Sequence, residues 1–150
     1  MPIIYLTRKS VFCASHRLHS PELSELENKN VFGKCNFPNG HGHNYVLKVT
    51  IKGKPDPRTG MLTNMSDLKR IIEESIIERM DHKHLNLDVP EFFDVNPTAE
   101  NLVVVIWSIL SKKLNGNLLH EVTVHETENN SSTYRGELTS SKGHQPIERA

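Results

Sequence analysis

The chain has 150 residues, of which 36% are hydrophobic and 24% are charged, and its 18 basic and 18 acidic residues cancel to a formal net charge of zero. This length suits a single domain with its own core. The charge balance argues against a nucleic-acid-binding protein that relies on a broad basic surface, but it allows a local cationic pocket for a phosphorylated small molecule.

Residues 3–13 carry β-branched and aromatic side chains at short spacing, which is typical of a strand. In residues 20–33, an N-cap at Ser20 and a glycine at Gly33 predict a short helix. Residues 43–53 alternate in polarity and predict a second strand. The apolar side chains of this strand share one face: Tyr45, Leu47, Val49 and Ile51.

The rest of the chain predicts two amphipathic helices, a loop between them and a C-terminal hairpin. Apolar side chains recur at helical spacing in residues 66–80, which Ser66 or Asp67 can cap, and again in residues 97–114. The remaining segments are a loop at 81–93, a strand at 118–127 and its hairpin partner at 132–138.

This order of elements predicts one α+β domain, residues 1–138, in which two helices cover one face of a four-stranded antiparallel sheet. The other face retains apolar residues, so we expect a further subunit to cover it. Residues 139–150 are polar and predict a flexible tail.

The location of the protein is predicted from its cysteines and its apolar stretches. Two cysteines, Cys13 and Cys35, are too few for a disulfide-stapled secreted scaffold. The N-terminal residues lack the pattern of a secretory signal, and no stretch reaches the roughly 20 apolar residues that a membrane helix needs. We therefore expect a soluble, cytoplasmic protein with reduced thiols.

The stretch "GKCNFPNGHGHNY" places His41 and His43 on either side of a glycine. Residues i and i+2 of a strand point to the same face, so both imidazoles can converge on one point. An isolated H-x-H motif is more often a pair of surface histidines, but a catalytic zinc site needs only one further protein ligand.

The sequence leaves the identity of that third ligand open. His16 is favoured because strands close in sequence tend to be neighbours in space. The competing candidates are the pairs His82 with His84 and His120 with His125.

Three further positions are candidates for chemistry. Cys35 lies in a turn-forming segment and is either a metal ligand or a thiolate base beside a metal. Asp81 precedes His82, so its carboxylate can orient the imidazole for proton exchange, although a charged helix end is the simpler explanation. Glu126 continues the apolar face of residues 118–127, which predicts a ligand or a buried partner for its carboxylate.

Taken together, the segments from Ser10 to Glu137 resemble the 6-pyruvoyl tetrahydropterin synthase family. The motifs that carry the resemblance occur in family order: "FCASHRL", "GKCNFPNGHGHNY", "GMLTNMSDLK", "MDHKHLNLDVP", "TAEN" and "VHETENNSSTYRGE". The resemblance implies the tunnelling fold (T-fold), with sheets that close into trimeric barrels and two trimers that stack into a homohexamer. It also implies conversion of 7,8-dihydroneopterin triphosphate to 6-pyruvoyl tetrahydropterin in tetrahydrobiopterin biosynthesis.

The resemblance further implies a role for each candidate residue. These roles are Zn²⁺ binding by His16, His41 and His43, a general base at Cys35, a supporting relay of Asp81 and His82, and pterin contacts from Glu126 and Thr98. The sequence departs from the pattern of animal members at four positions, Cys13, His84, Ala99 and His125, where Ser, Asn, Thr and Tyr are usual. Of these, Ala99 affects an expected pterin contact.

Three alternatives fit parts of the pattern. The related 6-carboxytetrahydropterin synthases share zinc and the fold, but their bacterial members have a shorter spacing than the five residues that separate Cys35 from His41. A non-catalytic zinc- or pterin-binding module would not require Cys35 together with Asp81 and His82. A structural zinc site would add Cys35 to the three histidines.

Overall fold

The computed structural model describes residues 1–115, 117–140, 143, 144, 146 and 147. Its strands are β1 (Ile4–His16), β2 (His41–Gly53), β3 (Lys83–His84), β4 (Leu119–His125) and β5 (Ser131–Tyr134). Its α-helices are α1 (Glu25–Phe32), α2 (Met65–Ile72), α3 (Glu78–Met80), α4 (Leu85–Asp88) and α5 (Ala99–Lys113). A π-helical turn, Glu73–Ile77, joins α2 to α3, and short 3-10 helices cover Gly33–Asn36 and Pro90–Phe92.

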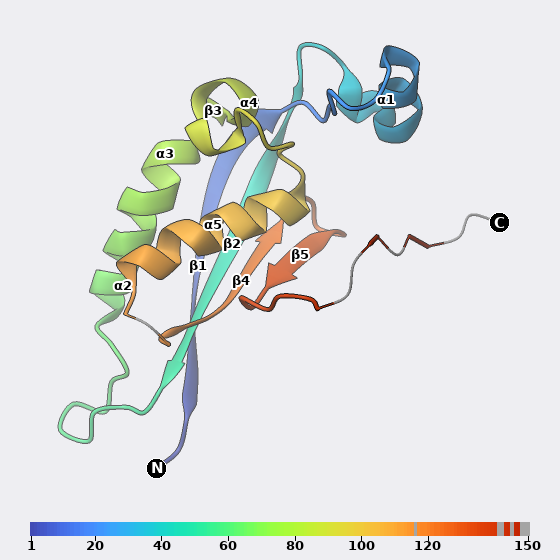
Figure 1. Ribbon diagram of the computed structural model, residues 1–150. Coiled ribbons are helices and arrows are strands. Elements are labelled where there is room, and N and C mark those ends of the chain that lie inside the picture. Colours follow the sequence, from blue (N-terminus) through green and yellow to red (C-terminus); the bar gives the residue numbers. More distant parts are fainter. Residues whose placement is uncertain (116, 141–142, 145, 148–150) are drawn as a thin grey trace.

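The strands form one sheet in the order β3-β1-β2-β4-β5. Helices α2, α3 and α5 lie across one face of this sheet, and α1 lies beyond the end at which β1 finishes and β2 begins (Figure 1). The α+β class and the placement of two long helical segments on one face are therefore confirmed. Within the described part of the chain, no helix is long and apolar enough to cross a membrane.

The longest pairing in the sheet joins β1 to β2. The predicted inward-facing side chains of β2 are all fully buried: Tyr45, Leu47, Val49 and Ile51. The two strands run antiparallel from Ile4 opposite Gly53 to His16 opposite His41. Both strands therefore extend past the predicted ranges at this end, because the pairing continues through Ser15 and Gly42.

A fifth strand corrects the predicted four-stranded sheet. Residues 83 and 84, expected in a loop, pair parallel to Ala14 and Ser15 at the outer edge of β1, which makes the sheet mixed. The preceding residues align them with this edge, because the Asp81 carboxylate accepts the Cys13 N–H and the His82 N–H donates to the Cys13 carbonyl. Sequence periodicity cannot reveal a strand of two residues.

The hydrophobic core lies between the sheet and the helices. The stripe predicted for residues 66–80 is confirmed in most of its members, since Leu68, Ile72, Ile76 and Met80 are buried. The predicted caps at Ser66 and Asp67 are wrong, because the N-cap is Asn64, whose side chain accepts the Ser66 N–H. On α5, the buried residues are Leu102, Val103, Ile106 and Leu110.

The C-terminal strand is held against α5 by aromatic packing. The rings of Tyr134 and Trp107 meet edge to face at 5.4 Å between their centroids. Gly136 has a φ of +78°, and a Cβ at this position would lie 2.6 Å from the Trp107 ring, so the passage of the chain requires glycine. Of the predicted tail, residues 141, 142, 145 and 148–150 lie outside the described residues.

The N-terminus of α1 corrects the predicted cap at Ser20. The Ser24 side chain accepts the Glu27 N–H at 3.1 Å, and the Glu27 carboxylate accepts the Ser24 N–H at 3.0 Å. This capping box satisfies two backbone donors reciprocally. Ser20 lies outside the helix, and its N–H donates to the Asn28 side chain instead.

We predict that Ser24→Ala weakens α1 by about 1 kcal/mol, because it removes the side-chain acceptor of the capping box. Hydrogen exchange of the Glu27 and Asn28 amides measures the free energy of local opening. Ser20→Ala is the matched control and leaves these amides unchanged. An equal effect of both substitutions would contradict the assignment of the cap.

Candidate metal centre and active site

Three histidines converge where β1 ends and β2 begins. Residue pairing sets His16 opposite His41 and Ala14 opposite His43, so the three imidazoles share the helix-covered face of the sheet. Their ring centroids lie 4.6, 5.1 and 4.9 Å apart, and their candidate ligand atoms all lie within 4.8 Å of one another. His16, the favoured third ligand, therefore joins the H-x-H pair, and this group could hold a metal ion.

The spacing of the donor atoms suits zinc. The Nε2 atoms of His16 and His41 lie 3.1 Å apart, close to the roughly 3.3 Å expected between two nitrogens that bind a tetrahedral Zn²⁺ at about 2.0–2.1 Å. The Nε2 atom of His43 is buried and has no hydrogen-bond partner. A metal would satisfy this nitrogen, whose isolation is otherwise costly.

Burial keeps the imidazoles of His16 and His43 in the form that binds metals. Desolvation is the largest cause that lowers the pKa of His16, to about 4, and it also lowers the pKa of His43. Both rings are therefore neutral near pH 7, and a neutral imidazole has a free nitrogen lone pair for a metal.

The ring of His16 is held by groups that the sequence did not indicate. Its Nδ1 atom lies 2.7 Å from the Pro97 carbonyl oxygen and 3.3 Å from the Tyr45 hydroxyl. Because a carbonyl only accepts, Nδ1 carries the proton and Nε2 is left for a metal. Tyr45 could have been found from its alternation with His43, whereas the contact with Pro97 joins residues 81 positions apart.

Glu126 brings a carboxylate to the same group. It follows directly after β4, and its Oε1 atom lies 3.6 Å from His43 Nε2. The predicted buried partner of this carboxylate is therefore a histidine of the cluster. The charge of Glu126 also acts on Tyr45, whose pKa is raised mainly by burial and further by this carboxylate.

Cys35 is not a member of the metal-binding group. Its free thiol is partly buried in the 3-10 helix Gly33–Asn36. The Cys35 carbonyl accepts the Leu18 N–H at 2.9 Å, which ties this turn to the segment that follows His16. The thiol also contributes to the raised pKa of Tyr45, so both side chains lie within electrostatic range of each other.

Asp81 and His82 form a hydrogen-bonded pair at the outer edge of β1. The Asp81 Oδ2 atom lies 2.8 Å from His82 Nδ1, and hydrogen bonds from the Cys13 N–H and then from His82 lower the pKa of Asp81. The His82 side chain is 81% exposed, and its backbone has a φ of +61°. Among the hydrogen bonds of the described residues, none links this pair to Cys35 or to the three histidines.

The remaining candidates lie outside the metal-binding group. Thr98 is the N-cap of α5, and its hydroxyl accepts the Asn101 N–H at 3.2 Å. The charge of His84 contributes to the lowered pKa of His16, and the buried Nδ1 atom of His84 has no hydrogen-bond partner. His120 packs against the ring of Tyr5.

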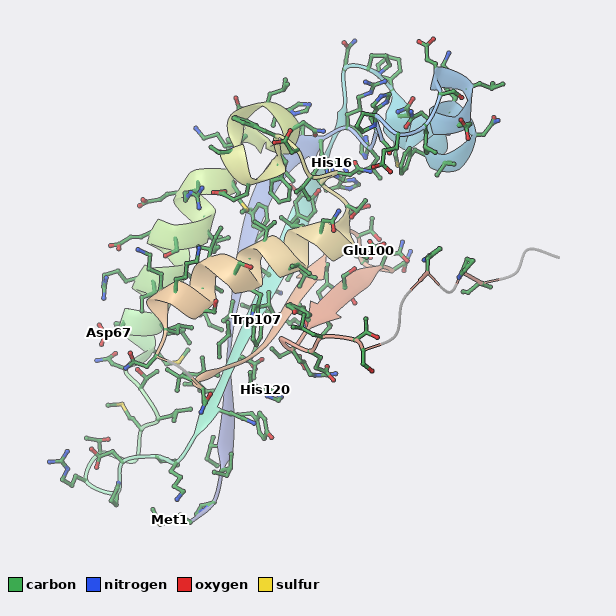
Figure 2. All side chains as sticks on the ribbon, in the orientation of Figure 1. Met1, His16, Asp67, Glu100, Trp107 and His120 are labelled. Carbon is green, nitrogen blue, oxygen red and sulfur yellow. The ribbon has the colours of Figure 1, made fainter. Side chains whose placement is uncertain are left out.

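The surface has two cavities near this end of the sheet, and none of the three histidines lines either of them. One, of about 630 Å³, is lined by Glu126 together with residues of β1, β2 and β4 that include Lys9 and Lys48. The other, also of about 630 Å³, is lined by Arg17 and His84. Figure 2 shows His16 and Glu100 at the same end of the molecule, where α5 begins.

The fold and this site define an α+β protein with a candidate three-histidine metal centre beside a carboxylate and a free thiol. The sequence profile of the family described as 6-pyruvoyl tetrahydropterin synthase matches residues 5–137. The chain belongs to this family of enzymes.

Individual relatives agree with the family match. The chain is 55% identical to 6-pyruvoyl tetrahydrobiopterin synthase of Poecilia reticulata over 133 residues, which cover 89% of this chain and 90% of that protein. It is 52% identical to the Homo sapiens protein of the same name over 132 residues, which cover 88% and 91%. The solved structure of Caenorhabditis elegans 6-pyruvoyl tetrahydropterin synthase superimposes with a TM-score of 0.87 at 41% identity, covering 91% and 98% of the chains.

We predict that His43→Ala weakens Zn²⁺ binding by more than the roughly 10–100-fold that is typical of outer-shell changes, because it removes a ligand. Competition with a chromophoric chelator measures the affinity. His84→Asn, which changes a neighbouring histidine outside the group, is the control and keeps the wild-type affinity. Equal losses in both variants would contradict the three-histidine site.

Proposed function

We propose that this protein is a zinc-dependent 6-pyruvoyl tetrahydropterin synthase. It converts 7,8-dihydroneopterin triphosphate to 6-pyruvoyl tetrahydropterin and releases inorganic triphosphate, which makes it a phosphorus–oxygen lyase. The observation that carries the proposal is the convergence of His16, His41 and His43, with Glu126 beside them, in a chain of this family. The family match supports the pterin substrate, and the geometry supports the metal dependence.

The three histidines would hold Zn²⁺ through their Nε2 atoms. A bound zinc ion supplies a Lewis acid that polarises the hydroxyl groups of the substrate side chain. The protein's own contribution is a rigid site, because two paired strands carry all three ligands and the Pro97 carbonyl orients His16.

Cys35 is the proposed general base. Its thiol is free, partly buried and close enough to Tyr45 to raise the pKa of that neighbour of His16 and His43. As a thiolate it removes a proton from the substrate side chain, after which internal redox transfer to the ring and loss of triphosphate follow. Cys35 lies outside the metal-binding group, which supports a base and argues against a structural four-ligand zinc site.

Asp81 and His82 are proposed to relay protons for this base. The lowered pKa of Asp81 keeps its carboxylate charged beside the imidazole, and the 2.8 Å hydrogen bond fixes the ring. Because the His82 side chain is 81% exposed, its second ring nitrogen is accessible for proton exchange.

Glu126 and Thr98 are the proposed pterin contacts. A carboxylate can accept two parallel N–H bonds from the 2-amino-pyrimidinone edge of a pterin. The Glu126 side chain is 22% exposed beside His43, so its carboxylate can be reached by a ligand. The Thr98 hydroxyl accepts one hydrogen bond within the chain and retains its own hydrogen for a ligand.

We predict that the purified protein releases triphosphate from 7,8-dihydroneopterin triphosphate and that a zinc chelator stops this release. Cys35→Ala loses turnover by about 10²–10⁴-fold, as expected for removal of a general base, while it keeps zinc and binds the pterin. Mass spectrometry identifies the product.

Two of the alternatives predict different results in this assay. A carboxylated pterin as the main product would indicate a 6-carboxytetrahydropterin synthase. A folded, zinc-loaded protein without release would indicate a binding module. Wild-type rates in Cys35→Ala would refute the role of this thiol as base.

We further propose that the protein is a homohexamer of two stacked trimers. In the described part of the chain, β5 ends one side of the sheet, and β1 has no strand partner on its outer edge before Ala14. Such edges can pair with those of another copy and close a barrel. The side chains of Tyr5 and Val11 are exposed on the face without helices and would be covered by closure.

Light scattering coupled to size-exclusion chromatography tests the assembly, with a mass of six chains as the expected result. Lys9→Pro is unsuitable as a test, because it could also disrupt the pairing of β1 with β2 inside one chain. Thr133→Pro, in the short edge strand β5, is the better variant for blocking contacts between chains. We expect this variant to dissociate. A monomeric wild-type protein would contradict the hexamer.

A further inference from the structure

The start of α5 supports the candidate zinc ligand His16 through the main chain. The His16 side chain is fully buried, and its Nδ1 atom donates to the Pro97 carbonyl at 2.7 Å. This hydrogen bond determines which nitrogen of the imidazole remains free. The direction of one peptide carbonyl therefore sets the orientation of a ligand.

The peptide unit that precedes this carbonyl, Asn96–Pro97, has no N–H to fasten it, because residue 97 is a proline. Asn101, in the first turn of α5, forms hydrogen bonds with the residues on both sides of Pro97. Its side-chain Nδ2 donates to the Asn96 carbonyl at 2.8 Å, and its backbone N–H donates to the Thr98 hydroxyl at 3.2 Å. Asn101 thus brackets Pro97 by bonding the residues before and after it.

Two further hydrogen bonds of Asn96 hold the residue to which Asn101 donates. The Asn96 carbonyl also accepts the Thr98 N–H at 2.8 Å, and its side chain accepts the His19 N–H at 3.2 Å. The turn at residues 96–98 is therefore fastened to the segment that follows His16. Of these bonds, only the one that Asn101 Nδ2 donates to the Asn96 carbonyl joins a side chain of α5 to the main chain of the turn.

We propose that Asn101 is a positioning residue for the metal: it holds the Pro97 carbonyl toward His16 Nδ1 and so presents His16 Nε2 to Zn²⁺. This role rests on the zinc site of the proposed function. Residues that orient a ligand in this way typically change metal affinity about 10–100-fold when they are altered.

Asn101→Asp separates this role from helix capping. Aspartate has the same shape, and a negative charge in the first turn of a helix is favourable. The carboxylate cannot donate to the Asn96 carbonyl and repels it instead. The helix is therefore preserved while the hydrogen bond to the Asn96 carbonyl is lost.

The experiment compares Asn101→Asp with Asn101→Ser, which removes the donor without adding charge. The exposed Asn117→Asp is a control for the added charge at a distant site. For each protein we would measure Zn²⁺ affinity by chelator competition, the visible absorption of the Co²⁺-substituted form, and the thermal unfolding of the metal-free form.

Both Asn101 variants are expected to bind Zn²⁺ about 10–100-fold more weakly and to show an altered Co²⁺ spectrum, with metal-free unfolding close to that of the wild type. Asn117→Asp is expected to match the wild type. Wild-type affinity and spectrum in Asn101→Ser, whether or not Asn101→Asp folds, would overturn the role of Asn101. A wild-type protein that binds no zinc would overturn the zinc site itself.

Discussion

The antiparallel pairing of β1 with β2 is the constraint on which the rest of the site depends. A shift of this register by one residue would turn His16 to the opposite face of the sheet from His41 and His43. The buried, alternating side chains of β2 prevent such a shift, because it would expose the core. The hydrophobic pattern of one strand thus determines the geometry of the candidate metal centre.

Beyond His16 the chain leaves the sheet, and asparagine side chains replace a neighbouring strand. The side chains of Asn86 and Asn28 each bind both backbone groups of one residue, Arg17 and Ser20 respectively. Between them, the Asn36 side chain donates to the Leu18 carbonyl, and the Asn96 side chain accepts the His19 N–H. Partly buried backbone groups without such partners would be costly. This network connects the segment after His16 to four separate parts of the chain.

The proposed chemistry is divided between two places within one chain. The histidine cluster, Glu126 and the Cys35 turn lie at the covered end of the sheet, whereas Asp81 and His82 lie on the outer edge of β1. Burial favours neutral imidazoles as metal ligands, while exposure leaves His82 accessible for proton exchange. The two environments suit the two proposed tasks.

Residue spacing by itself determined much of this protein: the class of fold, the inward face of β2 and the convergence of His41 with His43, since all three depend on local periodicity. For the third ligand it favoured His16 without excluding other histidines. Only the tertiary structure showed that His16 joins the other two histidines, and only it revealed the two-residue strand β3, the cap at Ser24 and the contact of His16 with Pro97. These features depend on long-range pairing or on hydrogen-bond geometry, which no local pattern encodes.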